Sequence, residues 1–148
     1  MASTLTPTSF NITITEEQIV RNNIVKHEVR QTINDVTNVD HRILTCPQTT
    51  SIDLFNINGI NPGAGTFPSS SLKYARITNL DNTYNTAIII SGSNGTFTQK
   101  LTPASSLLIF NSDITSSTFN GDFGDDISSV KAYAISSSID IEYTLVNA

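Results

Sequence analysis

The side chains best suited to bind a metal ion lie together in one polar segment, NGDFGDD. Its side chains Asn120, Asp122, Asp125 and Asp126 place oxygen ligands within seven residues. Hard oxygen ligands at this density suit Ca²⁺. The spacing differs from that of an EF-hand loop, because no glutamate closes the segment at the required distance after the glycine. These four residues are a candidate Ca²⁺ site, and an acidic surface turn is the favoured interpretation, since Asp and Asn suit turn geometry.

The residues that carry catalysis in many enzymes form no recognisable pattern here. The chain has two histidines, His27 and His41, and no G-x-S-x-G, phosphate-binding or dinucleotide-binding motif. Cys46 ends an apolar run, which predicts a small buried hydrophobic residue. The adjacent carboxylates Glu16 and Glu17 would point to opposite faces of a strand and could not flank one glycosidic bond. The sequence therefore predicts a protein that is not an enzyme and uses no cofactor.

Composition excludes two classes of partner. Charged residues make up only 14% of the chain and the net charge is −5. Nucleic-acid binding requires clustered Lys and Arg, whereas the eight basic residues here are scattered. The longest apolar run, AIII, is far shorter than the ~20 residues that span a bilayer. We therefore expect no nucleic-acid and no membrane partner. The start MASTLTPTSF lacks a signal-peptide pattern, which predicts synthesis in the cytosol.

The N-terminal quarter is the most ambiguous part of the sequence. Residues 10–15 alternate between apolar and polar side chains, as a half-buried strand does. The stretch EEQIVRNNIVKHEVRQTINDV could form a helix, but Val25, Val29 and Ile33 occupy alternate positions that match a strand. Asn residues in RNN suit a tight turn. We favour a long β-hairpin, with His27 on its inward-facing side.

The remaining sequence alternates between short strands and turn residues. Residues 42–47 and 51–56 are predicted strands, and a Gly/Pro-rich loop follows at 58–71. Between 73 and 111 the short connections predict a meander, with an Asn94-Gly95 hairpin turn. Segments 129–135 and 138–146 predict a closing hairpin.

About nine or ten short strands with regular turn signals define an all-β fold. We expect one domain over residues 1–148, an antiparallel β-sandwich of jelly-roll-like form. Residues 1–9 are poorly periodic and are predicted to form an extended N-terminal arm that adds to a neighbouring sheet edge.

The stretch KYARITNLDNTYNTAIIIS, followed by a hairpin and KLTPASSLLIFN, resembles small virion structural proteins of tailed bacteriophages. The resemblance covers residues 73–111 well and the N-terminal hairpin least. It implies a sandwich or jelly-roll domain that often acts as a trimer. It also implies a structural role for one segment, in which a strand enters a tight turn whose Asn and Asp side chains bond to their own backbone. The residues of this segment are Arg76, Ile77, Thr78, Asn79, Leu80 and Asp81.

The expected function is that of a capsid decoration, or cement, protein located in the virion. Such a protein stabilises the head lattice through contacts with itself, as a homo-oligomer and most simply a trimer, and with the major capsid protein. The alternative is a tail, baseplate or head-fibre component that binds a host glycan or protein receptor.

Overall fold

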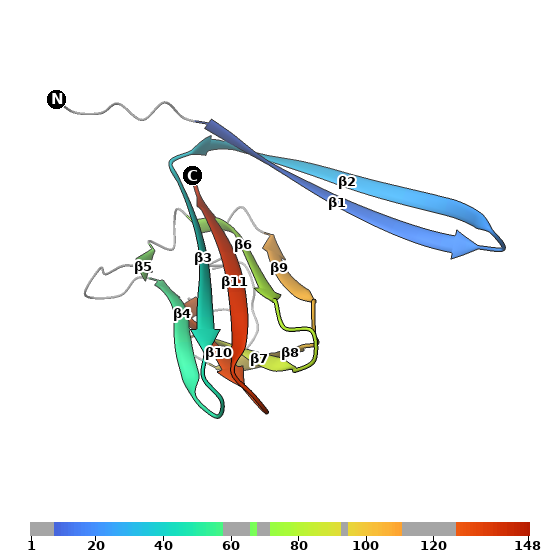
Figure 1. The fold of residues 1–148 in the computed structure, drawn as a ribbon. Coiled ribbons are helices and arrows are strands. Elements are labelled where there is room, and N and C mark those ends of the chain that lie inside the picture. The colour runs from blue at the N-terminus through green and yellow to red at the C-terminus, as the bar shows by residue number, and fades with distance from the viewer. Residues whose placement is uncertain (1–7, 58–65, 68–71, 93–94, 111–126) are drawn as a thin grey trace.

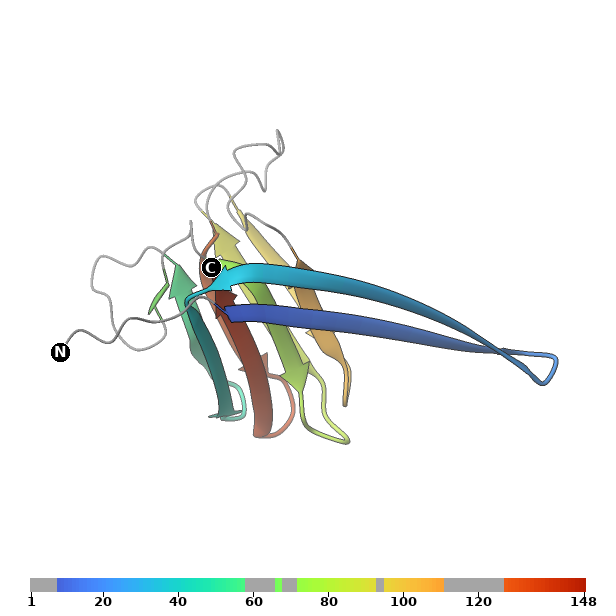
Figure 2. The ribbon, with the colours of Figure 1, turned by 90° about the horizontal axis from the view of Figure 1, so that it is seen from above.

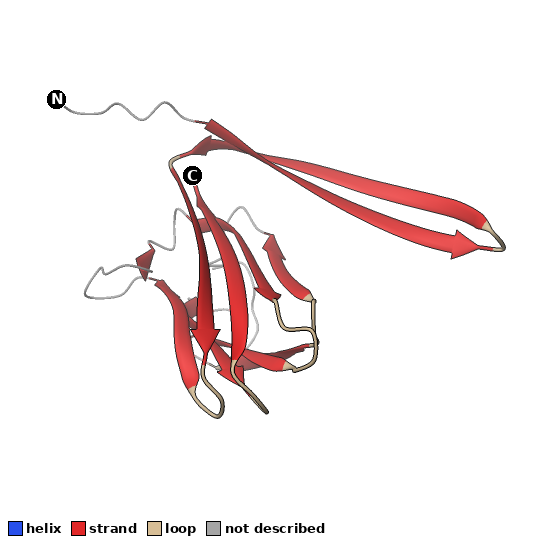
Figure 3. Ribbon diagram, viewed as in Figure 1, coloured by secondary structure: helices blue, strands red, loops and turns tan. Residues whose placement is uncertain are grey.

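The structure, a computed structural model, describes residues 8–57, 66–67, 72–92, 95–110 and 127–148. These residues form strands and their connections, and none of them lies in a helix (Figure 3). The prediction of an all-β fold is confirmed.

Two sheets face each other and form a sandwich (Figures 1 and 2). The four-stranded sheet has the order β3 (Asn38–Cys46), β11 (Ile139–Asn147), β6 (Leu72–Asn79) and β9 (Ser106–Phe110). The five-stranded sheet has the order β5 (Thr66–Phe67), β4 (Ser51–Ile57), β10 (Ile127–Ala134), β7 (Thr86–Gly92) and β8 (Thr96–Leu101). All pairs are antiparallel except β4–β5.

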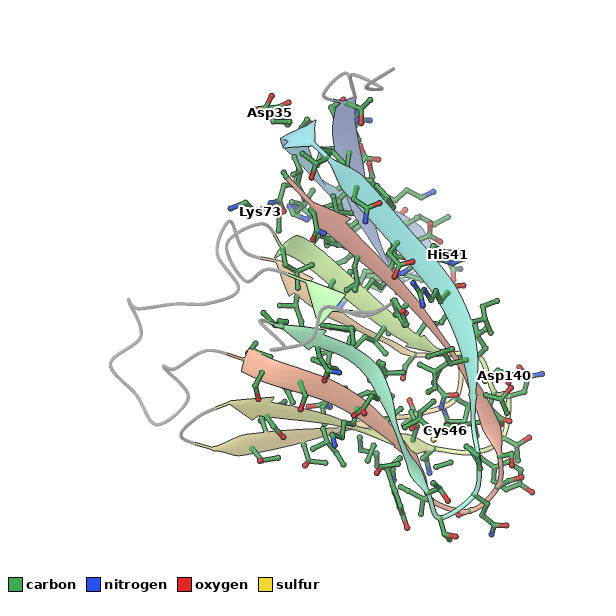
Figure 4. The ribbon with its side chains drawn as sticks, turned by 90° about the vertical axis from the view of Figure 1, so that its left-hand side faces the viewer. Asp35, His41, Cys46, Lys73 and Asp140 are labelled. Carbon is green, nitrogen blue, oxygen red and sulfur yellow. The ribbon has the colours of Figure 1, made fainter. Side chains whose placement is uncertain are left out.

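The core lies between the two sheets, because alternate residues of each strand point inward. Ile77, Ile88 and Ile141 are fully buried there. The rings of Tyr143 and Phe55 pack across the core with their centroids 5.9 Å apart. Cys46 is also enclosed between the sheets, with its Sγ 3.5 Å from the carbonyl oxygen of Ala132 (Figure 4). The prediction that Cys46 is a small buried residue is confirmed.

The expected pairing of neighbouring strands is wrong in two places. Between residues 73 and 111 only β7 and β8 form a hairpin, whereas β6 pairs with β9 in the opposite sheet. Strands β10 and β11 also belong to different sheets and form no closing hairpin. Turn residues mark where a strand ends, but they do not show whether the next strand returns alongside it or crosses to the other sheet.

The turn after β6 has the structural role that the sequence predicts for Asn79 and Asp81. The fully buried Asn79 amide donates to the carbonyl oxygen of Tyr84 at 2.9 Å and accepts from the Asp81 amide at 3.0 Å. The carboxylate of Asp81 accepts from the amides of Thr83 and Tyr84 at 2.6 and 2.7 Å. These bonds, first that from Tyr84, lower the pKa of Asp81. They stabilise the connection that carries the chain from one sheet to the other.

We predict that Asn79→Ala lowers the free energy of unfolding by about 2–3 kcal/mol, because a buried amide with several backbone partners is removed. Urea unfolding followed by circular dichroism measures this loss. The matched control is Asn82→Ala in the same turn, where the side chain is exposed and the change should stay within about 0.5 kcal/mol. Equal effects of the two substitutions would contradict the role of Asn79.

The first two strands leave the sandwich as a separate ribbon. From here on, the arm means this hairpin of β1 and β2 and not the N-terminal segment 1–9. Among the described residues, strands β1 (Thr8–Val20) and β2 (Asn23–Val36) pair only with each other, and they project past β9 (Figures 1 and 2). Their two-residue turn has Arg21 and Asn22 at φ 48° and 66°, as the tight turns of hairpins require. The prediction of a long hairpin in this region is confirmed.

Two other expectations about the N-terminal region need correction. Thr8 and Ser9 begin β1, where Thr8 pairs with Val36 of the same chain, so they do not belong to a free segment that could add to a neighbouring sheet. Residues 1–7 of the predicted segment lie outside the described residues. Most of the hairpin side expected to face inward is exposed, because the arm leaves the sandwich after its first few residues.

A β-bulge attaches the arm to the sandwich. Phe10 pairs with Ile33 and Thr8 with Val36, so β2 contains one extra residue between these pairs. Asp35, at φ 57°, absorbs this residue. Ile33 and Val36 would point to opposite sides of a regular strand, but both are buried in one cluster at the arm base. The bulge therefore lets β2 place both of these side chains against the sandwich.

Candidate interaction surface

Most apolar residues of the arm lie on one side of the ribbon, here called its apolar side. This side also carries the polar residues Glu16, Gln18, Asn23, His27 and Gln31. In the pairing register, Ile14 lies opposite Val29, Glu16 opposite His27, and Gln18 opposite Val25. Opposed residues point to the same side, so these pairs, together with Phe10, Ile12 and Ile33 at the base and Val20 at the tip, line one side. Burial decreases outward: Ile12 is buried, Ile14 is half-buried, and Val29 is 50% exposed.

The opposite side of the arm is polar and makes its own cross-strand contacts. Lys26 forms an ion pair with Glu17 at 3.0 Å, and Thr32 donates to Asn11 at 2.8 Å. Arg30 pairs with Glu28 along β2. A ribbon with one apolar and one charged side is suited to lie on another surface with its charged side in water.

The tip differs from the middle of the arm because both of its sides are apolar. Ile19 and Ile24 are a cross-strand pair on the otherwise polar side and are 71% and 60% exposed. Val20 and Val25 on the other side are about half exposed. Five of the twelve large hydrophobic residues exposed in the described part of the chain thus lie on the arm. Exposed apolar residues that cluster in this way mark an interaction site.

A hollow of about 370 Å³ opens on the apolar side of the arm. Its lining is Ile12, Ile14, Glu16, His27, Val29 and Gln31. The twist of a two-stranded ribbon produces such a concave side. The hollow can accept an apolar side chain, while Glu16 and His27 supply an acid and a base beside it.

The outer side of the four-stranded sheet carries a cluster of charges across three strands. Glu142 on β11 pairs with Arg76 on β6, and its Oε1 lies 3.5 Å from Nε2 of His41 on β3. Arg76 is also 3.5 Å from the hydroxyl of Thr144. Ile43 follows His41 on the same side of β3 and is 56% exposed. This surface combines paired charges with three exposed apolar side chains, those of Val39, Ile43 and Leu108.

The structure does not bring the candidate catalytic residues together. His41 lies on the outer side of β3, Cys46 lies in the core, and His27 lies on the arm. Burial raises the pKa of the Cys46 thiol, which disfavours the reactive thiolate. Glu16 and Glu17 point to opposite sides of β1, as the strand period requires.

The candidate Ca²⁺ residues Asn120, Asp122, Asp125 and Asp126 lie outside the described residues. Within the part of the chain that is described, no three His, Cys, Asp or Glu side chains are grouped so that they could hold a metal ion. That same part contains no helix with the length and apolar character needed to cross a membrane.

Comparisons of this chain with protein-family models, with curated proteins and with solved structures find no match. The identification of the arm as an interaction surface therefore depends on its geometry and exposure. The sequence alone did not indicate this surface, because one side of the hairpin was expected to face inward. One available signal was QIVRNNIV, where apolar residues flank the turn on both sides of the ribbon.

Tyr143 gives a pH-dependent test of the core beneath the charged sheet. Burial, together with the nearby Asp40 carboxylate 3.4 Å from the hydroxyl, raises the pKa of Tyr143 to about 12. The folded chain therefore keeps this phenol protonated at a pH where the unfolded chain ionises it. The resulting stability is complete below the ordinary pKa of 10 and is lost as the pH rises toward 12.

We predict that the wild-type chain loses about 2–3 kcal/mol more stability than Tyr143→Phe between about pH 10 and 12. Urea unfolding at several pH values measures the difference. The other tyrosines are common to both proteins, so their contributions cancel. A stability difference that stays constant across this window would contradict the protonated, buried phenol.

Proposed function

We propose that this chain is a virion structural protein of a tailed bacteriophage, and specifically a non-enzymatic decoration protein of the capsid. It binds the head lattice and other copies of itself, and it reinforces the lattice by bridging neighbouring subunits. The virion is its proposed location, and the major capsid protein is its proposed partner besides itself. The sequence resemblance over residues 73–111 supports this assignment.

The observation that carries the proposal is the arm. A two-stranded ribbon of this length with an apolar side gains little by itself in water, because isolated hairpins are marginally stable. It gains much by lying on another protein, where its apolar side and tip are covered. A chain that projects such a ribbon from a stable sandwich is suited to hold neighbours together.

The strand order supports the jelly-roll form of the proposal. Strands β3-β11-β6-β9 form one sheet, and β4-β10-β7-β8 form the main part of the other. A jelly roll distributes its eight strands between two sheets in this order. Jelly-roll domains are common in viral capsid proteins, which agrees with the proposed context.

The surface composition supports the same context. The hydroxyl groups of Thr78 and Ser106, 2.8 Å apart, connect β6 and β9 on the outer side of the four-stranded sheet. Contacts of this kind are nearly neutral, so they depend little on salt. A protein covered by neighbours in a dense lattice benefits from such a surface.

We predict that shortening the arm abolishes capsid binding without unfolding the sandwich. In this variant Asn-Gly replaces residues 15–28, so that Ile14 and Val29 flank a two-residue turn in the original register. Co-sedimentation with expanded capsids that lack this chain measures binding. The control replaces only Arg21 and Asn22 by Asn-Gly, which keeps the full arm length and should preserve binding.

Unchanged capsid occupancy by the shortened variant would contradict the role of the arm. Failure of the full-length chain to bind capsids, together with binding to whole host cells, would favour a receptor-binding tail or fibre component and overturn the decoration function.

A further inference from the structure

We propose that the uncovered apolar side of the arm docks on the four-stranded sheet of a second copy, where Ile43 of that copy enters the hollow between Ile14 and Val29. This inference rests on the proposed role of the arm as a contact between subunits, and it names the partner.

The arm base already demonstrates this type of contact within one chain. Phe10 packs against Tyr74 on the outer side of β6, with their ring centroids 5.5 Å apart. Ile12, Tyr74 and Val146 are buried in the same cluster. The apolar side of this ribbon therefore fits the outer side of this sheet in composition and shape. The outer arm continues the same side, with Ile14, Val29 and Val25 in place of Phe10 and Ile12.

The rest of the sheet cannot be covered by the arm of its own copy. The arm runs past β9 and continues away from the sandwich in both views (Figures 1 and 2). Ile43 on β3 and Leu108 on β9 remain 56% and 38% exposed on the outer side of the sheet. Each copy thus has an uncovered ribbon and an uncovered sheet, which can meet only between copies.

The charges beside the two surfaces are complementary. The hollow has Glu16 and His27 at its rim, and the sheet has Arg76 and Glu142 next to the position of Ile43. When Ile43 enters the hollow, Glu16 can approach Arg76, whose side chain is 38% exposed and has further N–H donors. The imidazole of His27 can approach Glu142 in the same orientation. An acid and a base on each surface therefore fix the direction in which the ribbon lies.

The dimensions favour this arrangement over an arm-to-arm pair. From Ile12 to Val20 the ribbon is about 30 Å long and two strands wide, so one side offers about 300 Å². An arm-to-arm pair uses the apolar side of each copy once and buries about 300 Å² per subunit. A single arm-on-sheet contact is no larger. However, each subunit can make two such contacts, one through its arm and one through its sheet, and together they bury about 600 Å².

The test uses one substitution on each surface. Val29→Lys disables the arm and leaves the sheet intact, whereas Ile43→Lys disables the sheet and leaves the arm intact. Both positions are exposed, so the sandwich should fold in both variants, which circular dichroism checks. By sedimentation velocity at high protein concentration, we expect the wild-type chain to self-associate and each variant by itself to be monomeric. We expect an equimolar mixture to form a dimer that is joined by a single arm-on-sheet contact and is therefore weaker than the wild-type assembly.

The dimer in the mixture is the decisive result, because the intact arm of one variant can dock only on the intact sheet of the other. The controls are Thr15→Lys on the polar side of the arm and Thr98→Lys on the five-stranded sheet, and both should self-associate like the wild type. If Val29→Lys lost self-association while Ile43→Lys retained it, the result would indicate arm-to-arm pairing and overturn the proposal. A monomeric wild-type chain, or a mixture without a dimer, would also overturn it.

These outcomes are separate from the test of the decoration function. A chain that binds capsids but does not self-associate would retain the proposed function and refute this contact. A chain that self-associates through Val29 and Ile43 but does not bind capsids would support this contact and refute the decoration function.

Discussion

The contact between the arm base and the outer side of β6 and β11 determines what this molecule can do. Phe10, Ile12, Ile33 and Val36 cover Tyr74 and Val146 there, and full burial of each such side chain contributes about 1.5–3 kcal/mol. Without this contact the ribbon would be an isolated hairpin with no fixed direction. With it, the ribbon is an extension of the sandwich that leaves at a defined angle.

The bulge at Asp35 makes this contact large enough. A regular β2 would place either Ile33 or Val36 on the polar side of the arm, and the base would lose one of its buried residues. The amide of Thr37 then bonds to the carbonyl oxygen of Asn147 at 2.9 Å, which joins the end of β2 to the end of β11. The bulge and this hydrogen bond thus hold the end of β2 against β11, although these two strands are not paired in a sheet.

Local chemistry in the sequence was sufficient to predict the local structure. Strand positions, the Arg21-Asn22 turn and the self-bonding turn at Asn79 and Asp81 all follow from residue types within a few positions of each other. The pairing of distant strands did not follow, because β6 meets β9 and β11 through contacts that no local pattern specifies. The arm surface was missed for the same reason, since alternation of Ile and Val shows a strand with one apolar side but not what covers that side.

The angle of the arm has a further consequence for assembly. A contact in which each copy gives one surface and receives a different one closes into a ring only if the rotation between copies divides a full turn, and otherwise it continues as an open array. The sheet that would receive an arm also holds the base of its own arm, so the bulge and the Phe10–Tyr74 contact would set this rotation. In the proposed contact, the copy number of the assembly would then follow from how the arm is attached. Ile14 and Val29 would supply affinity, and the arm base would determine which assembly they stabilise.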